Sequence, residues 1–79
     1  MVEKANASLR VTVVREDTWY VAQCLDVDVA SQGRTEQLAL KNIQEALQLY
    51  FEYKPMPGGI EKSTNGELPI TVVEGKENE

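Results

Sequence analysis

The chain has 79 residues, of which 13 are acidic and eight are basic, so its net charge is −5, and it contains no histidine. A chain this short forms one domain with a thin core, and such domains often gain stability by oligomerising. Direct nucleic-acid binding is disfavoured, because phosphate contacts need a clustered basic face and the basic residues here are scattered. We therefore expect a homo-oligomer, and an acidic chain of this kind suits a basic protein partner.

The cysteine count limits the chemistry further. A single cysteine, Cys24, excludes an internal disulfide and, without histidine, leaves no usual zinc ligands. We predict no metal and no cofactor. The N-terminal residues lack the long apolar run of a signal peptide, and no run approaches the length needed to cross a bilayer. The expected location is the cytoplasm.

The first half of the chain shows the period of two that is typical of strands. Residues 1–7 carry no periodic signal and are expected to be disordered. Alternating residues predict strands over 9–15 and 19–25, joined as a hairpin by a polar turn. A tight connection at 26–28 leads to a third strand over 29–32. The short links make these strands antiparallel.

The two faces of this sheet differ in what covers them. The face expected to pack beneath a helix carries Leu9, Val11, Val13, Tyr20, Ala22 and Cys24. The small side chain of Ala22 lets a helix backbone approach the sheet. The opposite face carries Val14, Trp19 and Val21, and a single helix leaves it uncovered. Dimerisation, burial by the long loop and contact with a different protein are three ways to cover this face, and Val14, Trp19 and Val21 are the candidate interface residues.

A helix is predicted from an N-cap at Thr35 to about Glu52. Gly33 precedes it and is expected either to take a positive φ or to accommodate a close backbone approach. The residues predicted to face the core fall within an arc of about 120°, and they are Ala39, Leu40, Ile43, Ala46, Leu47 and Tyr50. Leu38 and Leu49 point in another direction, so they form a second candidate interface.

The last third of the chain contains a predicted loop and one more strand. Residues 54–67 are rich in proline and glycine and are expected to form a flexible loop. Residues 68–73 read as a fourth strand, in which Pro69 lacks an N–H and favours an edge position. Residues 74–79 form an acidic tail. The predicted fold is a single α+β domain of order β-β-β-α-β, with a four-stranded sheet covered by one helix.

Three patterns resemble chemical sites but have simpler structural explanations. Asp17, Asp26 and Asp28 lie near strand ends, but a metal-dependent hydrolase needs carboxylates that converge on one cation, and aspartates are common in turns. Cys24 has no histidine to act as its base, so we expect a small buried hydrophobic residue. Residues 31–35 contain too little glycine for an anion-binding turn, and a turn followed by a helix cap explains them. No catalytic residue is predicted.

One motif extends from the second predicted strand into the helix. It has an aromatic residue, an alanine and a cysteine in the strand, then a serine, a glycine and a threonine, then an Ala, Asn-Ile, Glu-Ala pattern in the helix. The residues are Tyr20, Ala22, Cys24, Ser31, Gly33, Thr35, Ala39, Asn42, Ile43, Glu45 and Ala46. With this motif, about the first two thirds of the chain resembles the HicB family of antitoxins, which are small bacterial and archaeal proteins.

The resemblance carries several implications. It implies a truncated ribonuclease H-like fold without the nuclease carboxylates, in which the fourth strand lies parallel to the first. It also implies binding and neutralisation of HicA, a small basic ribonuclease that cleaves messenger RNA. Many family members carry a C-terminal DNA-binding segment, and the sequence to Glu79 has none, so autorepression by this polypeptide alone is not expected. Leu38 departs from the glutamate that often closes a capping box with Thr35 in this family.

Two functions are therefore compatible with the sequence. The first is an antitoxin-like protein that occludes a small basic toxin of the HicA type. The second is a stand-alone oligomeric module without a toxin partner, either an orphan antitoxin or a binding scaffold. A fold alone does not decide between them, whereas a small basic reading frame beside the gene would.

Overall fold

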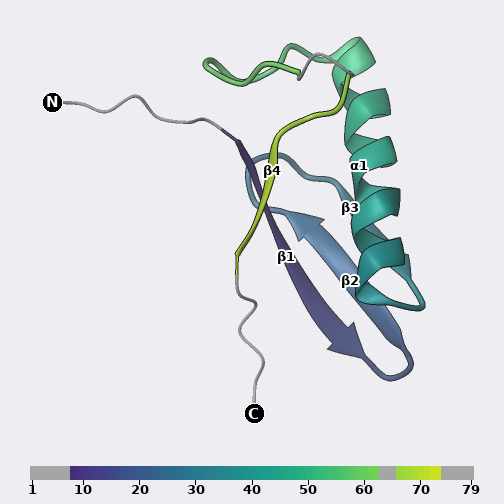
Figure 1. Cartoon of the computed structure of the whole chain (residues 1–79). Coiled ribbons are helices and arrows are strands. Elements are labelled where there is room, and N and C mark those ends of the chain that lie inside the picture. Colours follow the sequence, from purple (N-terminus) through teal and green to yellow (C-terminus); the bar gives the residue numbers. More distant parts are fainter. Residues whose placement is uncertain (1–7, 63–65, 74–79) are drawn as a thin grey trace, which may run out of the picture.

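A computed structural model describes residues 8–62 and 66–73, which form a mixed β-sheet with a helix on one of its faces (Figure 1). In chain order the elements are β1 (Leu9–Glu16), β2 (Trp19–Cys24), β3 (Ala30–Gly33), α1 (Glu36–Tyr53) and β4 (Ile70–Val73). The strand order is β3-β2-β1-β4. The pairs β1–β2 and β2–β3 are antiparallel, whereas β4 lies parallel to β1. The predicted α+β class, the β-β-β-α-β order and the parallel fourth strand are confirmed.

The strand boundaries differ slightly from the predicted ones. The third strand starts one residue later and includes Gly33. The fourth strand is shorter, because Pro69 has no N–H to extend the ladder, although its carbonyl accepts a hydrogen bond from the Leu9 N–H at 2.8 Å. β4 is an edge strand, as the proline predicts. The predictions of disorder over 1–7 and of an acidic tail over 74–79 lie outside the described residues.

The inward-facing residues of β1 and β2 build the core beneath α1. The register pairs Val11 with Cys24 and Val13 with Ala22, so these side chains share one face of the sheet. Ala22 is fully buried, which agrees with the prediction that a small residue lets the helix approach. The buried core residues are Leu9, Val11, Ala22, Cys24, Ala39, Ile43, Leu47, Ile60 and Leu68.

The helix lies over one side of the sheet and not over its middle. α1 packs mainly on β3 and β2 and much less on β1. Of the residues predicted to face the core, the fully buried ones are Ala39, Ile43 and Leu47, and the half-buried ones are Leu40, Ala46 and Tyr50. The predicted core face of the helix is confirmed.

The corner between β3 and α1 depends on Gly33. A Cβ added to Gly33 would lie 2.6 Å from the Ala39 backbone nitrogen and 2.7 Å from the Leu38 Cβ. The φ of Gly33 is not positive, so close backbone approach is the reason for glycine here. The helix then starts at its predicted cap, because the Thr35 hydroxyl accepts a hydrogen bond from the Leu38 N–H at 3.0 Å.

The connection between α1 and β4 also contributes to the core. Ile60 is 9% exposed and Leu68 is 3% exposed, and both pack with the core residues of the sheet and helix. The Gln44 side chain fixes the returning chain, since its Oε1 accepts from the Leu68 N–H at 2.9 Å and its Nε2 donates to the Leu68 carbonyl at 3.3 Å. Flexibility over 54–67 stays a prediction, but that prediction missed the core residue Ile60.

Candidate interaction surfaces

The face of the sheet opposite α1 is open in the part of the chain that the structure describes (Figure 1). Val14 and Val21 are cross-strand partners there, and both are half-buried. Trp19 is 39% exposed despite its large apolar ring. We call this surface the open sheet face, and its residues are Thr12, Val14, Trp19, Val21, Gln23, Ala30, Gln32, Thr71 and Val73. The structure thus brings together the three predicted interface residues of the sheet.

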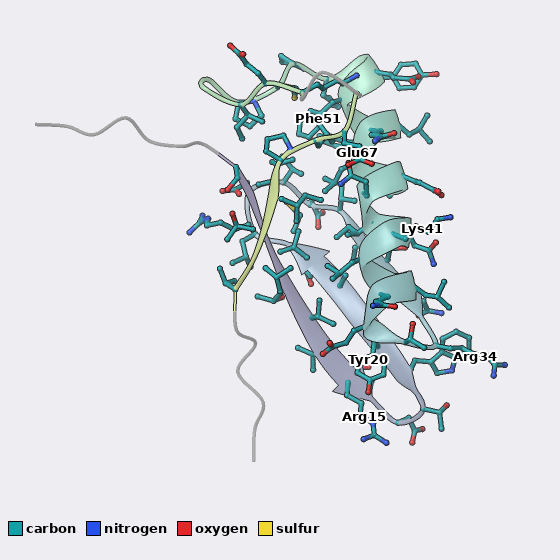
Figure 2. The ribbon with its side chains drawn as sticks, in the orientation of Figure 1. Arg15, Tyr20, Arg34, Lys41, Phe51 and Glu67 are labelled. Carbon is teal, nitrogen blue, oxygen red and sulfur yellow. The ribbon has the colours of Figure 1, made fainter. Side chains whose placement is uncertain are left out.

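The indole of Trp19 is held on the open sheet face by Arg34. The Arg34 Cζ lies 5.4 Å from the centre of the ring, which is a cation–π distance. The register explains the contact, because Tyr20 pairs with Gly33 and the next positions outward are Trp19 and Arg34. Figure 2 shows Arg34 at the strand-to-helix corner, reaching outward. Sequence analysis missed this contact, although an antiparallel alignment ending at Gly33 contains it.

The open sheet face also has a hollow. It has a volume of about 300 Å³ and is lined by Val21, Ala30, Ser31 and Gln32. Val21 and Gln32 are cross-strand partners, and Ala30 lies on the same face two residues before Gln32. The small side chain of Ala30 leaves room between these longer neighbours. The open sheet face therefore carries a partly exposed indole and a depression further along the strands.

The helix carries a second exposed apolar surface. Leu38, Leu49 and Tyr53 are 45%, 57% and 79% exposed. At about 100° per residue these three side chains fall in one arc of about 60°. We call this surface the helix flank, and its residues are Leu38, Asn42, Glu45, Leu49 and Tyr53. Sequence analysis found the two leucines but missed Tyr53, because the predicted helix ended at about Glu52.

Asn42 ties the helix flank to the outer edge of β3. Its Nδ2 donates a hydrogen bond to the Gln32 carbonyl at 2.8 Å. Carbonyls of alternate residues point out of an antiparallel edge strand, where they are open to pairing with another chain. The hydrogen bond from Asn42 occupies one of these carbonyls on the short edge strand β3. This contact gives the asparagine of the sequence motif a structural role.

Carboxylates lie within and beside the helix flank. Glu45 lies midway along the length of the helix flank, at the solvent edge of its arc, and Glu52 lies about 20° further toward solvent. The Lys41 Nζ is 3.6 Å from the Glu45 Oε2, and the two side chains are 66% and 63% exposed. Figure 2 shows Lys41 pointing away from the sheet. An exposed ion pair of this kind is weak and screened by salt, so Glu45 remains accessible to a cation on another molecule.

The structure places the residues of the three patterns that resemble chemical sites. Asp17 and Asp26 lie at opposite ends of β2. Among the described residues, no group of three or more His, Cys, Asp or Glu side chains is placed to hold a metal ion. Cys24 is a free thiol, 3% exposed, in the core, as predicted. The Thr35 hydroxyl caps the helix.

Asp26 closes the open end of the β1–β2 pair. Its Oδ2 accepts from the Arg10 N–H at 2.8 Å and its Oδ1 accepts from the Arg10 guanidinium at 2.9 Å. The carboxylate thereby continues a ladder in which the Leu25 N–H donates to the Arg10 carbonyl. Chiefly through the side-chain hydrogen bond, the pair lowers the pKa of Asp26 from its ordinary value of 3.8 and raises that of Arg10.

No family model, no curated protein and no solved structure matches the chain. Within residues 8–62 and 66–73, no helix is long and apolar enough to cross a membrane. The arrangement offers two apolar surfaces of different charge, the open sheet face and the helix flank. Both are suited to contact with other proteins.

Proposed function

We propose that the chain is a HicB-like antitoxin that acts in the cytoplasm by binding and neutralising a small basic mRNA-cleaving toxin of the HicA type, without catalysis of its own. The observation that carries this proposal is the helix flank, where the exposed apolar side chains of Leu38, Leu49 and Tyr53 lie beside the carboxylates of Glu45 and Glu52. Complementary charge speeds the encounter of two proteins and fixes their register. The motif in the sequence suggests which basic protein this is, and the sheet order agrees with the fold that the motif implies.

Neutralisation by occlusion requires a broad contact and no chemistry. The helix flank extends from Leu38 to Tyr53, about 22 Å at 1.5 Å per residue. A ribonuclease presents cationic groups to the phosphates of RNA. In the proposed complex the carboxylates of Glu45 and Glu52 meet those cations, while Leu38, Leu49 and Tyr53 supply apolar anchors.

Co-expression with the product of a small basic reading frame beside the gene tests this proposal. We expect a complex that co-purifies and restores growth. Glu45→Lys should weaken the complex at least about tenfold, because it sets a cation against the cations of the toxin. Glu61→Lys makes the same charge change on an exposed residue of the connection and is the matched control.

Three results would count against this function. If the wild-type chain binds no such product, the toxin partner is rejected. If both lysine variants weaken the complex equally, net charge governs the encounter and the helix flank is not the contact. If Glu45→Lys has no effect, the partner binds elsewhere.

A stand-alone oligomeric HicB-like module, either an orphan antitoxin or a binding scaffold, is the second candidate function. The open sheet face favours it, because the described residues at the centre of that surface include no carboxylate and need no basic partner. The same co-expression separates the two functions. A chain that associates with itself and binds no product of the neighbouring reading frame is the module.

The purified chain is expected to cleave no RNA, with or without magnesium. The reason is geometric, since Asp17 and Asp26 lie at opposite ends of β2 and do not share a cation. A labelled RNA incubated with the chain measures this directly. Magnesium-dependent cleavage that disappears in Asp28→Asn would contradict the prediction.

A further inference from the structure

We propose that a second copy of this chain covers the open sheet face, with the Trp19 indole of each copy seated in the hollow of the other. The contact is a two-fold one between identical surfaces, so an exposed aromatic edge and a depression on the same face can contact each other reciprocally. It uses a different surface from the helix flank, and its test does not depend on a toxin.

The charges on the open sheet face favour a second copy over a basic partner. Among the described residues, the ionised groups that border this face lie at its two ends, with Glu16 and Arg34 near the hairpin and Arg10 and Asp26 at the far end. Each of these pairs contains one positive and one negative group. The described residues at the centre of the face are apolar or uncharged, so two copies meet there without burying a like-charge pair.

The charges of the helix flank, in contrast, disfavour a second copy of the chain. Glu45 lies near the middle of the strip between Leu38 and Tyr53. A two-fold contact between two helix flanks sets each Glu45 beside its own copy near the symmetry axis. Like charges brought together in this way oppose association. Self-association is therefore assigned to the sheet and not to the helix.

The spacing of the indole and the hollow suits a two-fold axis. Trp19 precedes Val21 by two residues on β2, and Ala30 is the cross-strand partner of Gln23, four residues after Trp19. At about 3.3 Å per residue, the indole and the hollow are separated by roughly 7–13 Å along the strands. An axis between them places each indole over the hollow of the partner. The stacked Arg34 guanidinium restrains the ring before contact, which lowers the entropy lost on binding.

The area of the open sheet face limits the strength of this contact. Four strands about 4.8 Å apart and a β2 length of about 20 Å give a projected face of roughly 400 Å² per copy. Interdigitating side chains bury more than this projection, but a pair stays below the roughly 1,600 Å² of a standard stable interface. We expect a reversible dimer with a dissociation constant of about 1–100 μM.

Sedimentation of the full chain from about 1 to 100 μM measures the association over the expected range. Trp19 is the single tryptophan, so its fluorescence reports on the same surface and should shift to shorter wavelength as the dimer forms. We expect Trp19→Ala to weaken the dimer at least tenfold, about the effect of losing one central aromatic anchor. Circular dichroism shows whether that variant keeps its fold.

A second variant tests the hollow without touching the indole. Ala30 is exposed in the single chain, so Ala30→Lys should fold normally, fill the hollow and abolish the dimer. Gln37→Lys adds the same charge at an exposed helix position, and Leu49→Ser removes an apolar group from the helix flank. Both should associate like the wild type.

The proposal is overturned by a wild-type chain that remains a monomer at about 100 μM. It is also overturned if a folded Ala30→Lys variant dimerises like the wild type, or if Leu49→Ser alone abolishes the dimer, which moves the contact to the helix flank. A dimer that forms without any shift in tryptophan emission overturns the placement of Trp19.

Discussion

At Gly33 the sheet and the helix approach so closely that a single methyl group has no room. A Cβ there would lie 2.6 Å from the Ala39 backbone nitrogen, and a backbone atom in a helix cannot move aside cheaply. We therefore expect Gly33→Ala to lower the free energy of unfolding by about 1–3 kcal/mol, and Gly33→Val by more. Urea denaturation measures both variants.

Gly58→Ala is the matched control, because a Cβ at Gly58 would meet nothing within 4 Å. It should leave stability unchanged or raise it by about 0.4–1 kcal/mol, since alanine restricts the unfolded chain. Equal losses in Gly33→Ala and Gly58→Ala would contradict the assignment of Gly33 to a close backbone approach.

The ionised carboxylate of Asp26 contributes stability that its neutral form lacks. The side-chain and backbone hydrogen bonds from Arg10 hold the pKa of Asp26 below its ordinary value of 3.8. A lowered pKa in the folded state means that this contribution is complete above about pH 4 and is lost as the pH falls through the lowered pKa. We expect the free energy of unfolding to fall more steeply below about pH 4 in the wild type than in Asp26→Asn.

Asp28→Asn changes the same charge in the same bend and serves as the control for this pH dependence. Asparagine at position 26 keeps an oxygen for the Arg10 N–H, so the comparison isolates the ionised pair. Parallel pH profiles of the wild type and Asp26→Asn would show that the pair adds nothing to stability.

At the scale of elements, Gln44 joins the helix to the chain that enters β4. Its amide both accepts from and donates to the backbone of Leu68, whose side chain is 3% exposed. Gln44→Ala leaves two partly buried backbone groups without their partners, so we expect a loss of about 1–3 kcal/mol in the free energy of unfolding. Gln37→Ala, an exposed position on the same helix, should change it by less than about 0.5 kcal/mol.

An intermediate variant refines this prediction. Gln44→Glu keeps an oxygen for the Leu68 N–H but loses the donor to the Leu68 carbonyl. Its free energy of unfolding should therefore lie between that of the wild type and that of Gln44→Ala. Thermal unfolding compares the three proteins. A loss in Gln44→Ala no larger than that in Gln37→Ala would mean that water replaces both bonds at no cost.

The elements were predictable because each has a local signal. Alternation along β1 and β2 and the 3.6-residue period of α1 fix which side chains face inward before any tertiary contact is known. Thr35, a residue type that is common at helix N-caps, likewise predicts the start of the helix from the local sequence. The order of elements and the core face of the helix follow from such signals.

The contacts between distant residues were not predictable in the same way. Asn42 reaches the Gln32 carbonyl, and Gln44 reaches Leu68, only because the helix lies over β3 and the connection returns beside it. Neither residue has a periodic or turn signal for such a bond. Ile60 was not predicted to be a core residue, because the proline and glycine around it indicate a loop and a single apolar residue has no periodic pattern.

At the scale of the whole molecule, the two proposed contacts differ in charge and should respond oppositely to salt. Each copy of the chain carries a net charge of −5, so two copies repel each other at a distance. Salt screens this repulsion, with a Debye length that falls from about 30 Å at 0.01 M to about 10 Å at 0.1 M. The dimer should therefore tighten as sodium chloride is raised.

A complex with a basic toxin should instead weaken as sodium chloride is raised, because salt screens the attraction between an acidic and a basic protein and slows their encounter. Sedimentation of the chain alone and binding kinetics with the toxin, each measured at about 0.01 M and 0.1 M salt, compare the two. Glu61→Lys changes the net charge from −5 to −3 outside both surfaces, so it should reduce both salt effects and leave the contacts themselves intact. A dimer that weakens steadily with added salt would contradict this prediction, because attraction between the charged groups at the ends of the open sheet face would then outweigh the repulsion between the two net charges.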